Sequence, residues 1–256
     1  MQHTFTLAAW NFRLARRSLL ALWGIFAAQQ AAVILWRAAQ PGAAGLGLAS
    51  HYYATMQIFV YLGFYLLTAL AAGAATHNSR RARSGYTWAT LPGTPGQKFA
   101  AKAITIAAAE LVFAAWQLVW YIVEFYPVTA LEGWHRRQMY GAVLPAANLY
   151  EQVVTNNLFA RLLPRRPAQI VILLGILILS AVMLAALDTV RGWRKLPVFA
   201  GGLFCAWVCF GIVSIERHLE WLLDEPRYAF RIAAAAVLAV LTVWWAVRSI
   251  RRGEAV

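Results

Sequence analysis

Six long apolar runs constrain the fold of this chain more than any other feature. They cover, in order, residues 18–36, 53–76, 103–126, 168–187, 196–215 and 229–247. Each run is close to the ~20 residues that an α-helix needs to cross the hydrocarbon core of a bilayer. Helices are expected because a backbone in lipid must satisfy its hydrogen bonds within its own segment. The sequence therefore predicts an all-α polytopic membrane protein with six transmembrane helices.

The composition agrees with this prediction. Of the 256 residues, 61% are apolar and 13% are charged, whereas soluble domains average about 45–50% apolar and about 25% charged residues. The chain has too little polar surface to coat a soluble globule of its size. We expect a single transmembrane domain over residues 1–256, embedded in the cell membrane as a multi-pass protein.

The basic residues predict how the chain is oriented. The net charge is +13, but the charges lie between the apolar runs and form no continuous stripe of the kind that binds nucleic acid. We therefore expect contact with bilayer headgroups and no nucleic-acid partner. Six spans put both termini on one side, and most Lys and Arg residues, including every Lys, lie in the loops of that side. The positive-inside rule places both termini in the cytoplasm.

The connection between the third and fourth runs, residues 127–167, is expected outside the membrane and has its own pattern. Apolar residues recur there at helical spacing, at Leu149, Val153, Val154, Leu158, Phe159, Leu162 and Leu163. The opposite face carries Glu151, Asn156 and Asn157. One interpretation is an amphipathic helix that lies in the outer interface. The other is a lid over a central cavity.

Polar residues interrupt the third apolar run at a regular interval. Glu110, Gln117 and Glu124 are seven residues apart, so they share one helix face with a drift of about 20° per step. Carboxylates within a membrane are costly and usually face a protein interior or a water-filled path. The face therefore lines a translocation path, or it packs on another helix and bonds across it. Candidate partners on the first two runs are Gln29, Gln30 and Gln57.

Several enzymatic motifs are absent from the sequence. No Lys lies in the pattern G-x-x-x-x-G-K-[ST] of a phosphate-binding loop, and neither H-E-x-x-H nor G-x-S-x-G occurs. We therefore expect no ATP hydrolysis by this chain, no catalytic residue, and no resident metal or cofactor.

The connection between the second and third runs carries the most specific pattern. It contains, in order, Arg80, Arg81, Arg83, Tyr86, Trp88, Leu91, Pro92, Lys98 and Lys102. A basic cluster thus precedes a short segment that can be helical, followed by a Leu-Pro step and a Lys at the start of the next span. This order resembles the permease subunits of ABC-2-type transporters, in which such a segment forms a cytoplasmic coupling helix.

The resemblance implies how the chain would act. Two permeases, identical or homologous, would form a path for an amphiphilic substrate such as a peptide, an antibiotic or a lipid-like molecule. Separate ATP-binding subunits would bind ATP and Mg²⁺ and power export. The coupling residues toward that ATPase would be Arg80, Arg81, Arg83, Tyr86, Trp88 and Leu91. Two other classes stay open: a proton- or ion-coupled secondary carrier that uses Glu110 and Glu124, and a membrane anchor or sensor that transports nothing.

Overall fold

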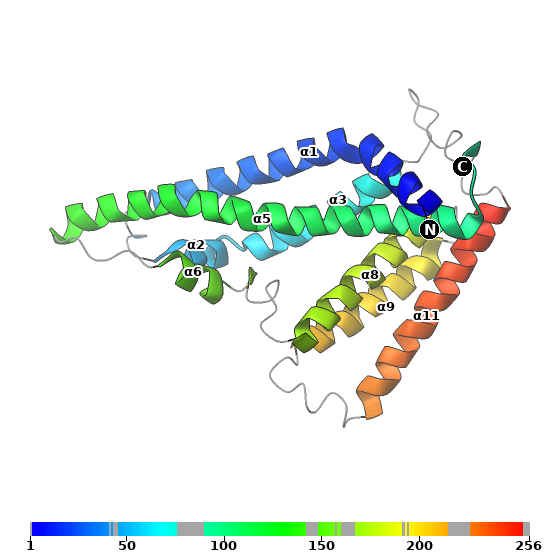
Figure 1. Ribbon diagram of the computed structural model, residues 1–256. Coiled ribbons are helices and arrows are strands. Elements are labelled where there is room, and N and C mark those ends of the chain that lie inside the picture. The colour runs from blue at the N-terminus through cyan, green and yellow to red at the C-terminus, as the bar shows by residue number, and fades with distance from the viewer. Residues whose placement is uncertain are drawn as a thin grey trace. The chain divides into compact units, whose positions relative to one another are not determined.

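The computed structural model describes residues 2–40, 42, 46–75, 90–141, 148–156, 158–159, 167–190, 193, 195–214 and 226–252. Within these residues the regular elements are helices, and no strand occurs (Figure 1). The helices are α1 (Gln2–Ala38), α2 (Leu48–Ala54), α3 (Gln57–Ala74), α5 (Pro95–Tyr140), α6 (Leu149–Thr155), α8 (Pro167–Thr189), α9 (Lys195–Ser214) and α11 (Pro226–Arg251). The predicted all-α class is confirmed.

Four of these helices have the length and hydropathy of membrane-spanning helices. The qualifying segments are His3–Ala38, Gln57–Ala74, Pro95–Met139 and Ala233–Arg251, with mean hydropathies between 1.6 and 1.8. Two shorter apolar segments, Leu173–Thr189 and Lys195–Cys205, lie in α8 and α9. Several helices suited to cross a membrane are therefore confirmed. The count of six spans and the side of the termini stay predictions.

The chain packs as two compact units. Unit 1 comprises Met1–Arg17, Ala69–Glu110 and Val171–Val256, and unit 2 comprises Ser18–Thr68 and Leu111–Ile170. In unit 1, Met183, Cys205 and Ala235 form a buried cluster that joins α8, α9 and α11. Unit 2 has an aromatic core in which Phe26, Tyr61 and Phe113 contact one another.

The second predicted span divides into two helices. The sequence predicts one helix over 53–76, but α2 ends at Ala54 and α3 begins at Gln57. Met56 between them has a φ of 52°, a left-handed conformation that an α-helix cannot contain. Thr55 completes the end of α2 by donating its hydroxyl to the backbone oxygen of His51 at 2.8 Å. The apolar run therefore continues across a turn that its hydropathy does not reveal.

The third predicted span is part of a much longer helix. The sequence predicts a span over 103–126 and a loop from residue 127, whereas α5 continues for 46 residues to Tyr140. Such a helix is about 69 Å long, more than twice the ~30 Å of a hydrocarbon core. Pro127 lies inside it, where proline removes one backbone donor and its ring crowds the carbonyl four residues earlier. Because Val128 and Glu132 beyond it are buried, packing maintains the helix where a loop was expected, so that prediction is corrected.

The predicted amphipathic segment after α5 begins with a short helix. The helix α6 runs from Leu149 to Thr155, with Asn148 accepting from the backbone N–H of Tyr150 at 3.1 Å. The side chain of Asn156, just after α6, accepts from the backbone N–H of Leu158 at 2.8 Å. Leu158 and Phe159 are nevertheless buried. The rest of the predicted apolar stripe, Leu162 and Leu163, lies outside the described residues.

Candidate functional site

The three polar residues predicted on the third span are all buried on α5. The exposed fractions of Glu110, Gln117 and Glu124 are 0%, 0% and 3%. Gln117 and Glu124 belong to unit 2 and Glu110 to unit 1, so the two parts of this face have different surroundings. Full burial of polar groups in an apolar helix is stable only when they gain partners.

In unit 2, one tyrosine connects two of these residues. The hydroxyl of Tyr52, on α2, donates to Oε2 of Glu124 at 2.6 Å and accepts from Nε2 of Gln117 at 3.3 Å. Burial and the adjacent Glu124 carboxylate raise the pKa of the Tyr52 phenol well above its usual value. The phenol therefore stays protonated and acts as a donor. The result is a directional chain of hydrogen bonds from Gln117 through Tyr52 to Glu124.

In unit 1, Glu110 bonds to a different helix. The hydroxyl of Ser180, on α8, donates to Oε2 of Glu110 at 3.0 Å. Both buried carboxylates of the predicted face thus bond to residues outside α5, as the packing interpretation expects. Their part in a translocation path stays a prediction.

The predicted glutamine partners are arranged differently from expectation. Gln30 and Gln57 are buried, but neither side-chain amide makes a hydrogen bond within the described part of the chain. Gln29, beside Gln30, is only half-buried. The partner of Gln117 and Glu124 is instead Tyr52, which is on α2 and outside the predicted span.

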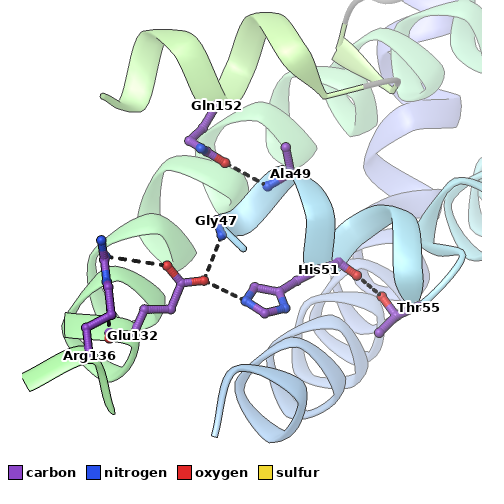
Figure 2. Close-up of polar contacts among 7 residues, drawn as sticks. All are labelled: Gly47, Ala49, His51, Thr55, Glu132, Arg136 and Gln152. Atoms are coloured by element: carbon purple, nitrogen blue, oxygen red, sulfur yellow. Dashed lines mark hydrogen bonds and ion pairs between the residues drawn. The ribbon is translucent and has the colours of Figure 1, made fainter. Parts of the chain in front are cut away.

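A second polar network in unit 2 was not predicted. Oε1 of Glu132, in the part of α5 beyond Pro127, accepts from the backbone N–H of Gly47 at 2.9 Å and lies 2.8 Å from Nε2 of His51 (Figure 2). Arg136, one turn further along α5, forms an ion pair with the same carboxylate, with its Nη2 3.8 Å from Oε2 of Glu132. The network therefore holds the start of α2 against the extension of α5.

The helix α6 joins the same network from the other side. Gln152 accepts from the backbone N–H of Ala49 at 2.9 Å (Figure 2), and its backbone oxygen accepts from the hydroxyl of Tyr121 at 2.9 Å. Glycine is favoured at position 47 because its φ is 75°, and the side-chain amide of Gln152 packs close against it, 2.6 Å from where a Cβ would lie. The one sequence signal for this network was the Glu132–Arg136 spacing, which is typical of helical ion pairs.

The start of α5 carries the described part of the predicted coupling segment. Thr94 and Gln97 form a reciprocal cap: the backbone N–H of Thr94 donates to Oε1 of Gln97 at 2.9 Å, and that of Gln97 donates to Oγ1 of Thr94 at 3.3 Å. Pro95 takes the first helical position, which proline favours. Leu91, just before the cap, is half-buried and packs against a cluster of Leu7, Ala8 and Ala101.

Five other residues of the predicted coupling segment belong to a part of the chain that the structure does not describe. Arg80, Arg81, Arg83, Tyr86 and Trp88 lie outside the described residues.

The two lysines at the start of α5 are buried, and one has an acidic partner in unit 1. Lys102 forms an ion pair with Asp188, in the last turn of α8. Gly73, near the end of α3, lies against the same carboxylate, since a Cβ there would be 3.3 Å from the carboxyl carbon of Asp188. The ends of α3, α5 and α8 therefore meet around one ion pair.

Comparison with protein-family models, with curated proteins and with solved structures finds no match for the chain. Among the described residues, no group of three or more His, Cys, Asp or Glu side chains is arranged to hold a metal ion.

Proposed function

We propose that this chain is the membrane-spanning permease subunit of an ATP-binding-cassette exporter. In this proposal six helices cross the cell membrane, with both termini in the cytoplasm. A second permease completes the path, and a separate ATPase binds ATP and Mg²⁺. The transported molecule is amphiphilic, of the peptide, antibiotic or lipid-like kind.

The observation that carries the proposal is the connection of the Leu91-Pro92 turn to two helices. The Thr94–Gln97 cap attaches the turn to the first turn of α5, and Leu91 packs on the cluster behind it. Further along α5, Lys102 is ion-paired with Asp188 of α8. A force on the turn would therefore move α5 and α8 together, as a coupling segment requires.

The burial of this ion pair makes the connection durable. The side chain of Lys102 is 3% exposed and that of Asp188 is 13% exposed. Separating such a pair leaves a buried charge without its counterion, which is strongly unfavourable. The pair therefore resists separation when the turn is displaced.

The proposal is tested by purifying the tagged chain from its own membrane in a mild detergent. We expect a co-purifying ATPase that carries a phosphate-binding loop, with hydrolysis that the isolated chain lacks. The purified chain alone, stripped of partners by high salt, is the control. Robust ATP hydrolysis by the lone chain, or a preparation free of any ATPase, would contradict the proposal.

A proton- or ion-coupled carrier is the second candidate. The buried Glu124, bonded to Tyr52 and linked through it to Gln117, is the observation that favours it. The two functions differ in their energy source. Uptake into inverted membrane vesicles that follows an imposed proton gradient without ATP supports the carrier, whereas uptake that needs ATP and survives an uncoupler supports the permease.

A further inference from the structure

Three buried glutamines of unit 2 have unused hydrogen-bonding capacity. Gln30, Gln57 and Gln117 are 0%, 1% and 0% exposed. Both amide atoms of Gln30 and of Gln57, and Oε1 of Gln117, lack a hydrogen-bond partner in the described part of the chain. Buried polar atoms are nearly always satisfied in folded proteins, so several unsatisfied ones at one place point to a missing partner.

The register of the helices puts the three amides at one level. Phe26 of α1, Tyr61 of α3 and Phe113 of α5 contact one another, with ring centroids 5.2–6.5 Å apart. Gln30 lies four positions after Phe26, and Gln117 lies four positions after Phe113. Gln57 lies four positions before Tyr61. Residues four apart lie on the same face of a helix.

The helices α1 and α3 run in opposite directions, so Gln30 and Gln57 lie on the same side of the aromatic trio. Phe26 contacts Phe64, whereas Trp23, earlier in α1, donates to Thr68, later in α3, at 3.1 Å. The two helices are therefore antiparallel. A forward step along α1 and a backward step along α3 lead toward the same end.

The direction of α5 agrees. Phe113 contacts Tyr61, whereas Glu132, later in α5, contacts His51, earlier in the chain. The helix α5 thus runs parallel to α1, and a forward step from Phe113 leads toward that same end. The three glutamines form a layer about 6 Å beyond the aromatic trio, which we call the polar layer.

The hydrogen bonds of Gln117 fix what the polar layer offers to a ligand. Tyr52 donates to Glu124, so its oxygen accepts from Nε2 of Gln117. This orients the amide and leaves Oε1 of Gln117 as an acceptor. The amides of Gln30 and Gln57 can each turn an oxygen toward the same ligand. A ligand that bonds to these three oxygens must therefore donate hydrogen bonds.

The surroundings of the polar layer indicate the charge of the ligand. The aromatic trio on one side of it carries no charge, and the carboxylate of Glu124 lies two turns further along α5 on the Gln117 side, which favours a cation. We propose that the polar layer binds the ammonium group of a primary alkylamine, whose three N–H donors match three amide oxygens. This inference rests on the proposed function, because the polar layer is a substrate site only if the chain is an exporter.

The experiment measures binding to the full chain in lipid nanodiscs, by the change in tryptophan fluorescence and in thermal unfolding. The probe is n-decylammonium. Decanol, decanoate and decyltrimethylammonium share its tail but lack, respectively, the charge, the positive sign and the N–H donors. We expect saturable binding of decylammonium alone, and an affinity at least about tenfold lower in Gln117→Met. Gln30→Met and Gln57→Met should weaken binding in the same direction.

The controls separate this site from packing and from other cations. Gln29→Met, at the half-buried neighbour of Gln30, should bind as the unchanged chain does. If Gln117→Met fails to fold, the Gln30→Met and Gln57→Met variants decide the question. Binding of Na⁺ in place of the amine, equal binding of decyltrimethylammonium, or unchanged affinity in all three variants would each overturn the proposal.

Failure of this inference can be distinguished from failure of the proposed function. Amine binding to the isolated chain needs no ATPase, so its absence leaves the permease proposal standing. A chain that binds the amine but never associates with an ATPase would instead retain the site and lose the permease assignment.

Discussion

Lys102 and Asp188 form a buried ion pair between the start of α5 and the last turn of α8 in unit 1. Burial lowers the pKa of an isolated ammonium, and a carboxylate in contact opposes that effect. Each charge of the pair therefore depends on the other for its stability in this buried position. The end of α3 packs closely against the carboxylate of this pair, at Gly73.

Replacing either member of this pair alone should destabilise the protein strongly. Lys102→Met leaves the Asp188 carboxylate without its counterion, at a cost of about 3–5 kcal/mol. The double variant Lys102→Met/Asp188→Leu removes both charges and should recover most of that loss. Thermal unfolding in detergent, compared among the single and double variants, measures the coupling. Additive losses in the double variant would show that the two charges do not interact.

Glu132 should stabilise unit 2 mainly as an acceptor. Glu132→Gln keeps an oxygen for the backbone N–H of Gly47 and for His51, so its effect should be small. Glu132→Leu leaves both groups buried without that acceptor, at about 1–3 kcal/mol for each unsatisfied group. The exposed Glu151 supplies a matched control, since Glu151→Leu should change stability by less than about 0.5 kcal/mol. Equal unfolding temperatures for Glu132→Leu and Glu151→Leu would contradict this account.

The sequence predicted what depends on local pattern. Hydropathy is a property of consecutive residues, so the apolar runs identified α1, α3 and α5 as helices, and the seven-residue spacing identified the buried face with Glu110, Gln117 and Glu124. What it missed depends on distant contacts. Pro127 is typical of a helix end, yet α5 continues because Glu132 beyond it bonds to Gly47 and His51, some eighty positions earlier in the chain.

The break at Met56 and the pairing of Lys102 with Asp188 could not be predicted for the same reason. A left-handed residue within an apolar run leaves no mark on hydropathy, and the partner of a buried lysine is set by how helices pack. Tyr52 was missed because it precedes the predicted second span, where aromatic residues are common at any membrane interface.

The hydrogen bond between Tyr52 and Glu124 should show measurable coupling. Tyr52→Phe removes the donor, and Glu124→Leu removes the acceptor. Hydrogen bonds between membrane helices average about 0.6 kcal/mol and reach about 1.7 kcal/mol, so we expect a coupling energy in that range from a double-mutant cycle of unfolding. Tyr53→Phe is the matched control, because the side chain of Tyr53 is 74% exposed. A coupling energy of zero would remove the directional chain on which the orientation of Gln117 depends.

The coupling segment is tested best at Trp88, and the structure gives the reason. Leu91 packs against Leu7, Ala8 and Ala101, so Leu91→Ala should lower stability by about 1–2 kcal/mol through lost burial as well as any ATPase contact. A coupling defect in Leu91→Ala would therefore combine lost stability with any lost ATPase contact. Trp88→Ala should weaken ATPase binding, since tryptophan is a favoured anchor of protein interfaces, while the unfolding temperature of the isolated chain stays constant. Pull-down of the ATPase and substrate-stimulated hydrolysis are measured together with thermal unfolding. Unchanged binding and hydrolysis in Trp88→Ala would show that the basic segment before α5 has no coupling role and would remove the main support for the permease.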